Sequence, residues 1–373
     1  MKSVTYHSGK FPPKNSDIDW ARLIPLIGPA NAAIARYDGL LNVIPNPNVL
    51  LSPLTMQEAV LSSRIEGTQA TLGEVLEYEA EKRDTVENAH QADIQEVLNY
   101  RAAIYQGVEL LKEMPLSGRF VRELHKILMR GVRGRNKAPG TFRKIPNWIG
   151  TPGCSIEEAR FVPCAADEVE RAIARWEHYL HDDSPDRLVQ LAVVHAEFEA
   201  IHPFLDGNGR LGRLLIPLFL YEKKILNHPD FYISEYLEEH RDEYYRHLLA
   251  VSKDGNWTDW IVFFLRAVTE QASRNQFKAQ QIVALYNRRK DWIANETRSQ
   301  YAIKALDWFF STPIFQSTDF IVNAEIPEPT AKRILRVVKD SGLLKELRPA
   351  KGRRAAIYAF SELLNIAEGH HAF

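Results

Sequence analysis

The feature that most limits the fold of this chain is a stretch in which two apolar helical patterns meet at a turn rich in proline and glycine. Apolar side chains recur at helical spacing through residues 185–201, and Pro203 then prevents that helix from continuing. Gly207 and Gly209 follow, and a second apolar helix starts near Arg210. The stretch therefore predicts a helix, a glycine turn and a second helix, whose first backbone N–H groups lack a partner within the helix.

The turn between these helices carries side chains suited to binding phosphate. Gly207 and Gly209 permit positive φ and the close approach of an anion, and Asn208 tolerates left-handed conformations. Arg210 and Arg213 are three positions apart, so they share one face of the second helix and can form forked hydrogen bonds with phosphate oxygens. The positive end of the helix dipole favours the same ligand. We therefore predict that an anion binds at this turn.

Two further side chains of the turn could act on such a ligand. Asp206 offers hard oxygen ligands that could hold a Mg²⁺ ion shared with phosphates. His202 lies at the edge of the turn and can accept a proton near neutral pH. The alternative is a purely structural helix–loop–helix with a buried histidine and surface arginines, which leaves the combination of residues unexplained.

A metallohydrolase is another alternative for the same stretch. His195, Glu199 and His202 fall at positions i, i+4 and i+7 of one helix face, a spacing that could hold a metal ion. Their order departs from H-E-x-x-H, and the glycine-rich turn would have no role in such a site.

The run H-P-F-L-D-G-N-G-R-L-G-R at residues 202–213 resembles, at every fixed position, the signature H-x-F-x-D/E-G-N-G-R-x-x-R of the Fic (filamentation induced by cAMP) family. This resemblance implies a mainly α fold, namely a Fic-type helical core with a small β-hairpin flap. It also implies transfer of AMP from ATP to a Tyr, Thr or Ser hydroxyl of a target protein or of the enzyme itself, with release of pyrophosphate. In that reading His202 is the general base, Phe204 anchors the loop and Asp206 is the Mg²⁺ ligand. The residues implied to bind the nucleotide are Asp206, Gly207, Asn208, Gly209, Arg210 and Arg213.

A second stretch has the pattern of a helix that ends in a carboxylate. Ser52 is suited to cap the helix, Pro53 to its first position and Gly67 to its end, so the sequence predicts a helix over about residues 53–66. Glu66 then lies in the last turn, where the helix dipole disfavours an anion. A cation from elsewhere in the fold should therefore accompany this side chain.

The run Ser62-x-x-x-Glu66-Gly67 resembles the inhibitory motif S/T-x-x-x-E-G/N of Fic proteins that carry it N-terminal to the active site. The resemblance implies that Glu66 pairs with Arg213, so that ATP binds in a pose unfit for in-line attack. An ordinary amphipathic helix with a solvated glutamate is the alternative.

Two β-prone runs between residues 141 and 163 predict a hairpin. In the family this element is a flap that holds a target segment by strand addition, here through Asn147, Trp148, Ile149 and Gly150. A purely structural hairpin is the alternative. Farther on, Arg241 to Tyr245 resembles the segment R-x-x-Y-Y, which implies that Tyr244 lines the adenosine pocket, although an aromatic pair in the core is also open.

The composition is that of a globular enzyme, and its net charge gives no electrostatic attraction to membranes. Of 373 residues, 25% are charged, and the net charge is −1. Only Cys154 and Cys164 occur, so we expect free thiols and a cytoplasmic protein; a pair of the two cysteines or part of a zinc site is the alternative. The longest apolar run, residues 214–221, is too short to span a bilayer, so no membrane partner is expected.

The domain organisation that follows is an N-terminal helical region with the inhibitory helix (1–112), a catalytic core (113–290) and a winged-helix-like domain (296–373). The last rests on three helical patterns followed by two strand-like runs. Between residues 328 and 358, nine basic residues oppose three acidic ones, so DNA is a candidate partner. A nucleotide-sensing DNA-binding regulator built on a Fic core is therefore an alternative function, and a homodimer is left open. The nine are Lys332, Arg333, Arg336, Lys339, Lys345, Arg348, Lys351, Arg353 and Arg354.

Overall fold

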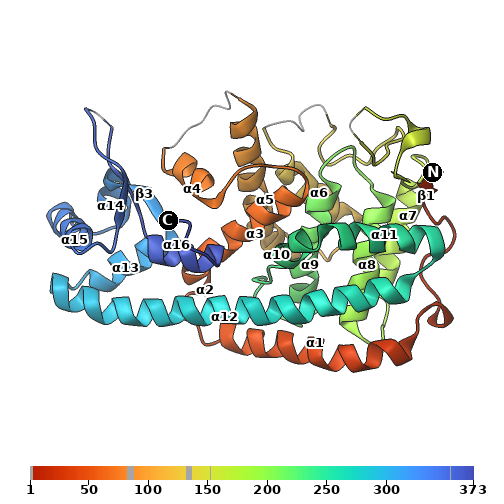
Figure 1. Ribbon diagram of the computed structural model, residues 1–373, viewed down its shortest axis with the longest axis horizontal. Coiled ribbons are helices and arrows are strands. Elements are labelled where there is room, and N and C mark those ends of the chain that lie inside the picture. The colour runs from red at the N-terminus through yellow and green to blue at the C-terminus, as the bar shows by residue number, and fades with distance from the viewer. Residues whose placement is uncertain (1–2, 82–87, 132–136, 152, 353) are drawn as a thin grey trace. The chain divides into compact units, whose positions relative to one another are not determined.

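The computed structural model describes residues 3–81, 88–131, 137–151, 153–352 and 354–373 (Figure 1). Most of the described chain is helical and its strands are short, so the prediction of a mainly α fold is confirmed. By internal contacts the chain forms two compact units. The first consists of Met1–Asp38, Leu61–Thr68 and Leu98–Ser273, and the second of Gly39–Val60, Gln69–Val97 and Arg274–Phe373. The division into three consecutive domains stays a prediction.

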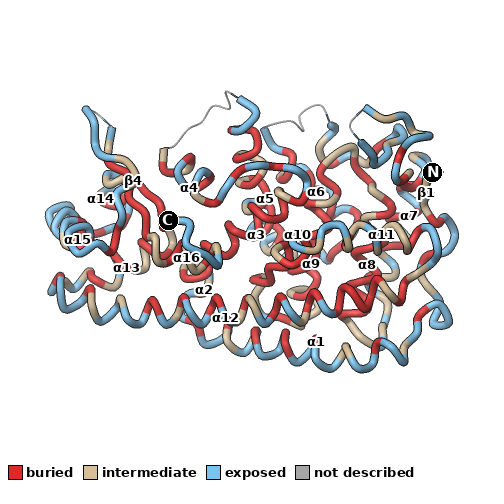
Figure 2. Tube along the Cα trace, in the orientation of Figure 1, coloured by how far each residue is buried: buried red, intermediate tan, exposed pale blue. Residues whose placement is uncertain are grey.

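The first unit is a helical core around a central helix, α8 (Arg187–Ile201), which is buried along nearly all of its length (Figure 2). Neighbouring helices α7 (Val169–His181) and α9 (Asn208–Glu222) pack against it. The indole N–H of Trp176 donates to the carbonyl of Val194 at 2.9 Å, and that of Trp260 donates to Ala192 at 2.8 Å. These bonds hold α8 inside the core without leaving a buried indole unsatisfied. The unit also includes α6 (Gly118–Leu128), α10 (Ser234–Glu239), α11 (Arg241–Asp254), the short helices η1 (Asn15–Asp17) and η2 (Ile156–Glu158), and all or part of α1 (Trp20–Leu41), α5 (Ala89–Leu111) and α12 (Trp257–Thr297).

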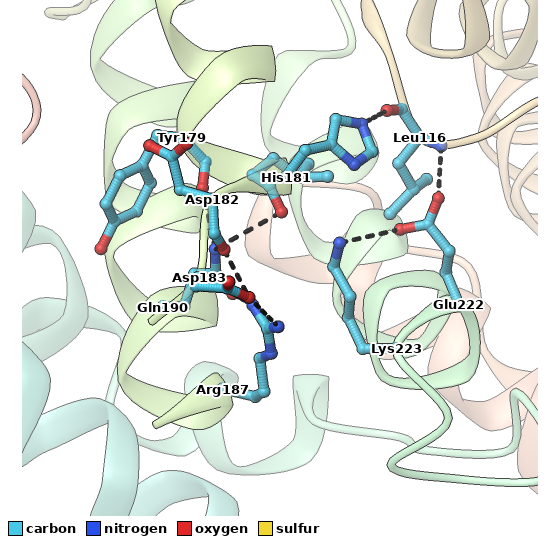
Figure 3. A network of polar contacts seen from close by, with 10 residues as sticks. Leu116, Tyr179, His181, Asp182, Asp183, Arg187, Gln190, Glu222 and Lys223 are labelled. Carbon is cyan, nitrogen blue, oxygen red and sulfur yellow. Dashed lines mark hydrogen bonds and ion pairs between the residues drawn. The ribbon is translucent and has the colours of Figure 1, made fainter. Parts of the chain in front are cut away.

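A polar network fixes the ends of α8 and α9 that lie away from the glycine turn (Figure 3). At the start of α8, Gln190 donates to the carbonyls of Tyr179 at 2.8 Å and Asp182 at 3.0 Å. At the end of α9, Glu222 accepts from the amide of Leu116 at 2.7 Å. The far ends of α8 and α9 are therefore held by polar contacts in addition to the packing of the two helices against each other.

The predicted hairpin between residues 141 and 163 is shorter in the structure than its sequence pattern suggests. Ile149 and Phe161 exchange two backbone hydrogen bonds, of 2.9 and 3.0 Å, and form a single antiparallel bridge. The strand β2 (Phe161–Val162) instead pairs in parallel with β1 (Val4–Thr5), near the N-terminus. A two-residue strand has no detectable periodicity, so the sequence could not indicate this pairing.

The second unit holds a small antiparallel sheet in the order β3-β5-β4. Its elements follow one another as helix, strand, helix, helix, strand, strand and helix, and aromatic rings of Phe309, Phe315 and Phe320 fill its interior. The winged-helix assignment stays a prediction. The elements here are α2 (Pro47–Leu50), α4 (Leu72–Ala80), α13 (Ala302–Ser311), β3 (Ile314–Gln316), α14 (Ser317–Asn323), α15 (Glu328–Asp340), β4 (Lys345–Arg348), β5 (Ile357–Ala359) and α16 (Ser361–Glu368).

The predicted inhibitory helix is α3 (Ser52–Ile65). Ser52 is its first helical residue rather than its cap, because α2 runs almost directly into α3, and the hydroxyl of Ser52 donates to the carbonyl of Ser311 at 3.4 Å. Gly67 follows the helix with a φ of 99°. Among the described residues, no helix combines the length and the apolar character needed to cross a bilayer.

Candidate active site

His202 lies just beyond the last residue of α8 in a left-handed conformation, with φ of 50° and ψ of 61°. A non-glycine residue adopts this conformation only when its surroundings hold it there. Arg143 supplies that support, since its side chain donates to the carbonyls of His202 at 2.9 Å and Ile201 at 3.2 Å, and also to Cys164. Its backbone amide donates to Pro203 at 2.9 Å. Arg143 therefore caps the end of α8 and fixes the backbone that carries the imidazole.

The glycine turn is held closed by Asn208. Its side-chain oxygen accepts from the amide of Phe204 at 2.8 Å, and its side-chain nitrogen donates to the carbonyl of Phe204 at 2.9 Å. The side chain is buried, so it shapes the turn and does not face a ligand. Gly207 has a φ of 77°, and a Cβ there would lie 2.8 Å from the sulfur of Met129. The turn thus needs both residues for its backbone path.

A second histidine, His125, contacts the glycine turn and stabilises it. His125 accepts at Nδ1 from the amide of Gly140 at 2.8 Å, so Nε2 carries the proton and donates to the carbonyl of Asp206 at 3.0 Å. Its ring stacks on Phe204 with centroids 3.7 Å apart. Burial lowers the pKa of His125 to about 4, which keeps the ring neutral. The sequence pattern gave no signal for His125 or for Arg143, because both act through backbone atoms far away in the chain.

The N-terminus of α9 faces the site, as the sequence predicts for an anion-binding turn. Its first backbone hydrogen bond runs from Leu211 to the carbonyl of Gly207 at 3.0 Å, so the preceding amides have no acceptor within the helix. Asp206 accepts from the amide of Gly207 at 2.7 Å, and its Oδ1 lies 3.7 Å from Nη2 of the buried Arg210. These amides and Arg210 therefore give the turn a positive potential, and Asp206 adds one carboxylate at its edge.

The donors present fit a Mg²⁺ ion that is shared with substrate phosphates. The side chain of Asp206 is 40% exposed, so its carboxylate can bind an ion without leaving its place beside Gly207. Among the described residues, no group of three or more His, Cys, Asp or Glu side chains forms an all-protein metal site. Magnesium sites that use one carboxylate together with phosphates and water need no such group.

Glu66 and Ser62 hold the second arginine of the turn. Arg213 is fully buried; its Nε donates to the hydroxyl of Ser62 at 2.9 Å, and its Nη2 donates to the Ser62 carbonyl at 2.8 Å and to Glu66 Oε1 at 2.7 Å. Desolvation raises the pKa of Glu66, but the charge and hydrogen bonds of Arg213 outweigh it, and the pKa lies below its ordinary value. The pair is therefore ionised at neutral pH.

Glu66 also covers the start of α9. A Cβ built on Gly209 would lie only 2.2 Å from Glu66 Oε1, so the carboxylate rests directly against the backbone where the helix begins. This is the place where the helix dipole favours an anion. The structure therefore puts a protein carboxylate where a ligand phosphate is expected.

A cavity of about 430 Å³ opens beside these residues. His202 lies in its wall, and burial lowers the pKa of this imidazole to about 4, although the charge of Glu66 opposes that shift. The ring is thus neutral at pH 7 and can accept a proton. The full lining consists of Glu66, Trp148, Ile149, Gly150, Arg160, Phe161, Ala196, Glu199, Ala200, His202, Gly209, Arg241, Tyr245, Leu248 and Leu249.

Three of the predicted flap residues line this cavity, and the fourth anchors them. Trp148, Ile149 and Gly150 form one wall, with Trp148 43% and Ile149 40% exposed. Asn147 donates from its side chain to the carbonyl of Phe204 at 3.0 Å, which ties the flap to the turn after His202.

The structure places Tyr245, and not Tyr244, in the cavity wall. The ring of Tyr244 is buried, and its hydroxyl bonds to Nε2 of His195 at 2.8 Å. Nδ1 of His195 bonds to the carbonyl of Gly212 at 3.2 Å, so both ring nitrogens are engaged. His195 is therefore a core residue, and among the described residues His195, Glu199 and His202 do not form the metal site that the metallohydrolase alternative requires. Cys154 and Cys164 are free thiols, as expected.

Comparison with known proteins agrees with the turn and the helices around it. The family model described as the Fic/DOC family N-terminal matches residues 24–109, and the Fic/DOC family model matches residues 115–220. A solved structure of a Fic family protein from Desulfovibrio desulfuricans G20 superposes with a TM-score of 0.58, at 21% identity, over 91% of this chain and 95% of that one.

Among curated proteins, the protein adenylyltransferase Fic of Drosophila grimshawi is 26% identical over 203 residues, which cover 53% of this chain and 38% of that protein. A probable protein adenylyltransferase of Aquifex aeolicus is 27% identical over 179 residues, covering 48% and 51%. The match thus spans about half or less of these relatives. Fold and site define a helical protein with a turn suited to bind an anion beside a neutral histidine. The chain belongs to the Fic/DOC family.

Proposed function

We propose that this protein is an autoinhibited protein AMP transferase, or AMPylator, which moves AMP from ATP to a Tyr, Thr or Ser hydroxyl of a target protein and of itself. The observation that carries the proposal is that a neutral His202 and the N-terminus of α9 border the same cavity, with Glu66 resting against that N-terminus. The relatives named protein adenylyltransferases support the same class of reaction. A cytoplasmic location, expected from the two free thiols, is part of the proposal.

In the proposed reaction the oxygen of the accepting hydroxyl forms a bond with the α-phosphorus of ATP. The bond between that phosphorus and the oxygen bridging to the β-phosphate breaks, and pyrophosphate leaves. The hydroxyl proton passes to the neutral imidazole of His202. Backbone amides at the start of α9 and the guanidinium of Arg210 stabilise the charge that develops on the phosphate. Asp206 would hold Mg²⁺, which when bound neutralises charge on the phosphates.

Inhibition follows from two effects of one carboxylate. Glu66 occupies Arg213, which is then unavailable to the γ-phosphate, and it covers the backbone of Gly209, where a phosphate would approach the helix. Withdrawal of the end of α3 would free both at once. Ser62 strengthens the closed arrangement, because its hydroxyl and carbonyl bond to the same guanidinium.

The target segment would dock along Trp148, Ile149 and Gly150. These residues line the cavity, and Ile149 already pairs with Phe161 in a strand-like geometry. A segment added beside them in an extended conformation would present its hydroxyl towards His202.

The test compares ATP labelled at the α-phosphate with ATP labelled at the γ-phosphate. We expect Glu66→Gly to transfer the α-label to protein and release pyrophosphate, wild type to do so slowly, and Glu66→Gly/His202→Ala not at all. Transfer of the γ-label alone would show a kinase-like reaction instead. Equal α-labelling with and without His202 would refute its role as the base.

DNA binding by the second unit is a second candidate function. On α15 the side chains of Lys332, Arg333, Arg336 and Lys339 are exposed, and their spacing places them on the outer face of the helix. Such a face could contact DNA phosphates. Arg353, which was counted with them, lies outside the described residues.

A gel shift with the full chain tests this second function. We expect Arg336→Glu to weaken DNA binding, and Lys112→Glu, an exposed residue of the first unit just after α5, to leave it unchanged. Equal affinity of both variants would remove the DNA role. A regulator without catalysis would show DNA binding but no transfer of label in the previous assay.

A further inference from the structure

Glu199 is a second carboxyl group in the cavity, and the proposed reaction does not use it. It lies on α8 one helical turn before His202 and forms part of the cavity wall. Its Oε1 is buried and has no hydrogen-bond partner among the described residues. A buried polar atom of this kind is unfavourable unless another group satisfies it. A polar side chain in a cavity wall with an unmet hydrogen bond is suited to contact a ligand.

The position of this carboxyl depends on a glycine in α9. A Cβ built on Gly212 would lie 2.2 Å from Oε1 of Glu199 and 3.1 Å from its Cδ. The two variable positions between Arg210 and Arg213 in the signature include Gly212, so the sequence pattern assigns it no role. In the structure its missing side chain leaves the space that the carboxyl of Glu199 fills.

The surroundings of Glu199 place it on the phosphate side of the cavity. It packs against the residue that precedes Arg213, and the charges of Arg213 and Glu66 are the two that act on it most strongly. Leu248 and Leu249, on α11, supply a different, apolar part of the wall, which suits a nucleotide base better than a phosphate. A ligand group that contacts Glu199 therefore also lies within the influence of the charge of Arg213, the arginine proposed for the γ-phosphate.

The protonation state of Glu199 differs from that of an ordinary glutamate. Burial raises its pKa to about 8, the charge of Arg213 opposes this, and the charge of Glu66 adds to it. At pH 7 the side chain is therefore a neutral carboxylic acid with one O–H donor. Above pH 8 it becomes a carboxylate, which repels an anion.

The other groups around Glu199 do not titrate in the same range. His202 and His195, on the same helix, have pKa values of about 4 and 3, and Glu66 stays ionised because its pKa is lowered. On α11, burial raises the pKa of Tyr245 to about 12 and raises the pKa of Tyr244 well above its ordinary value. Arg160 and Arg241 also line the cavity, and the buried Arg210 and Arg213 lie in α9; a guanidinium group is not deprotonated in proteins.

We propose that Glu199 is a nucleotide-recognition residue, whose carboxylic acid donates a hydrogen bond to a phosphate oxygen of bound ATP and whose ionised form repels that phosphate. This inference rests on the proposed nucleotide site. It predicts that the affinity for ATP falls at alkaline pH, because a residue outside the signature ionises there. The donor needs no partner within the protein, in keeping with the unmet hydrogen bond of this carboxyl.

The test measures the dissociation constants of ATP and of adenosine by calorimetry, from pH 7 to 9, in the Glu66→Gly background. With a pKa near 8, the affinity for ATP should fall about tenfold over this range, because only the protonated form binds well. The charge of Glu66 raises this pKa, so its loss in this background lowers the pKa, and the fall over the range should be tenfold or more. Adenosine has no phosphate, so its affinity should stay constant.

Glu66→Gly/Glu199→Gln keeps the shape and a donor but cannot ionise, so its ATP affinity should be independent of pH. Glu66→Gly/Glu170→Gln, which changes an exposed carboxyl on α7, should keep the tenfold fall. Glu66→Gly/Gly212→Ala displaces the carboxyl by a single methyl group, and should weaken ATP binding and flatten its pH dependence while the circular dichroism spectrum stays unchanged.

A pH dependence that survives in the Glu199→Gln variant would overturn the proposal. So would an equal fall in adenosine affinity, which would show that the contact is to the nucleoside. If no variant binds ATP at any pH, the proposed function itself fails, and this outcome is distinct from binding without pH dependence.

Discussion

The hydrogen bonds of Arg213 predict a graded release of inhibition. The guanidinium is fully buried and donates to Glu66 at 2.7 Å, to the Ser62 hydroxyl at 2.9 Å and to the Ser62 carbonyl at 2.8 Å. Glu66→Gly removes the charged acceptor and also clears the space above Gly209. Ser62→Ala removes one neutral bond and leaves the carboxylate in place. Glu66→Gly and Ser62→Ala should therefore destabilise the inhibited arrangement, in which Glu66 and Ser62 hold Arg213, by different amounts.

The increase in activity expected for each substitution follows from the kind of hydrogen bond that it removes. A hydrogen bond to a charged group contributes about 1.5–3 kcal/mol, and a neutral one about 1 kcal/mol. Because the side chain of Glu66 is 35% exposed, solvent screens the pair, and we take the lower part of that range, about 1.5–2 kcal/mol. At about 1.4 kcal/mol per tenfold, Glu66→Gly should raise the active population roughly 10- to 30-fold, and Ser62→Ala roughly fivefold. Glu66→Gln should fall between them, since a neutral bond can remain.

The assay is the initial rate of self-labelling with ATP labelled at the α-phosphate, over a range of ATP and Mg²⁺ concentrations. Ser63→Ala is the matched control, because Ser63 is the next residue of α3 and its buried hydroxyl has no hydrogen-bond partner among the described residues. It should label at the wild-type rate. If Glu66→Gly shows no gain at any concentration, or if Ser63→Ala activates as strongly as Ser62→Ala, the assignment of the inhibitory contact is wrong.

Three further predictions concern the glycine turn and the residue that supports it. In the Glu66→Gly background, kcat/KM should stay level on acidification to about pH 5 and fall only near pH 4, because the imidazole of His202 is neutral above its lowered pKa; a fall centred at pH 6.5 would contradict that shift. Asp206→Asn should raise the Mg²⁺ concentration for half-maximal activity by roughly tenfold, since it removes the anionic ligand, and an unchanged Mg²⁺ dependence would exclude Asp206 as the ligand. Arg143→Lys cannot reach several carbonyls at once, so it should lower kcat by roughly 10- to 100-fold with a smaller effect on the Kd for ATP; equal losses in both would indicate general unfolding, to be checked by the thermal midpoint.

The glycine turn could be predicted from sequence because its residues are close together in the chain. His202, Asp206 and Arg213 fall within a dozen residues, and proline and glycine fix where the helices stop and start. The contact of Glu66 with Arg213 joins residues 147 positions apart, and no periodicity indicates such a contact. The resemblance of two short motifs implied it, and the structure contains it.

Residues that act through backbone atoms could not be found in this way. Arg143 and His125 bond to carbonyls and amides of the turn, and any residue type can supply those. Asn208 was expected in the phosphate cradle, but its side chain spans the turn. Tyr244 and Tyr245 are adjacent, so the choice between them depends on the rotation of α11, which amphipathic patterning fixes only to within about one residue. In each case the missing information is three-dimensional.

The most direct measurement is the intact mass of the purified protein after incubation with ATP and Mg²⁺. Glu66→Gly should gain mass in steps of one AMP group, and Glu66→Gly/His202→Ala should gain none. A gain of phosphate alone, or the same AMP gain in both variants, would contradict the conclusion that His202 beside the start of α9 activates a hydroxyl for attack on the α-phosphate.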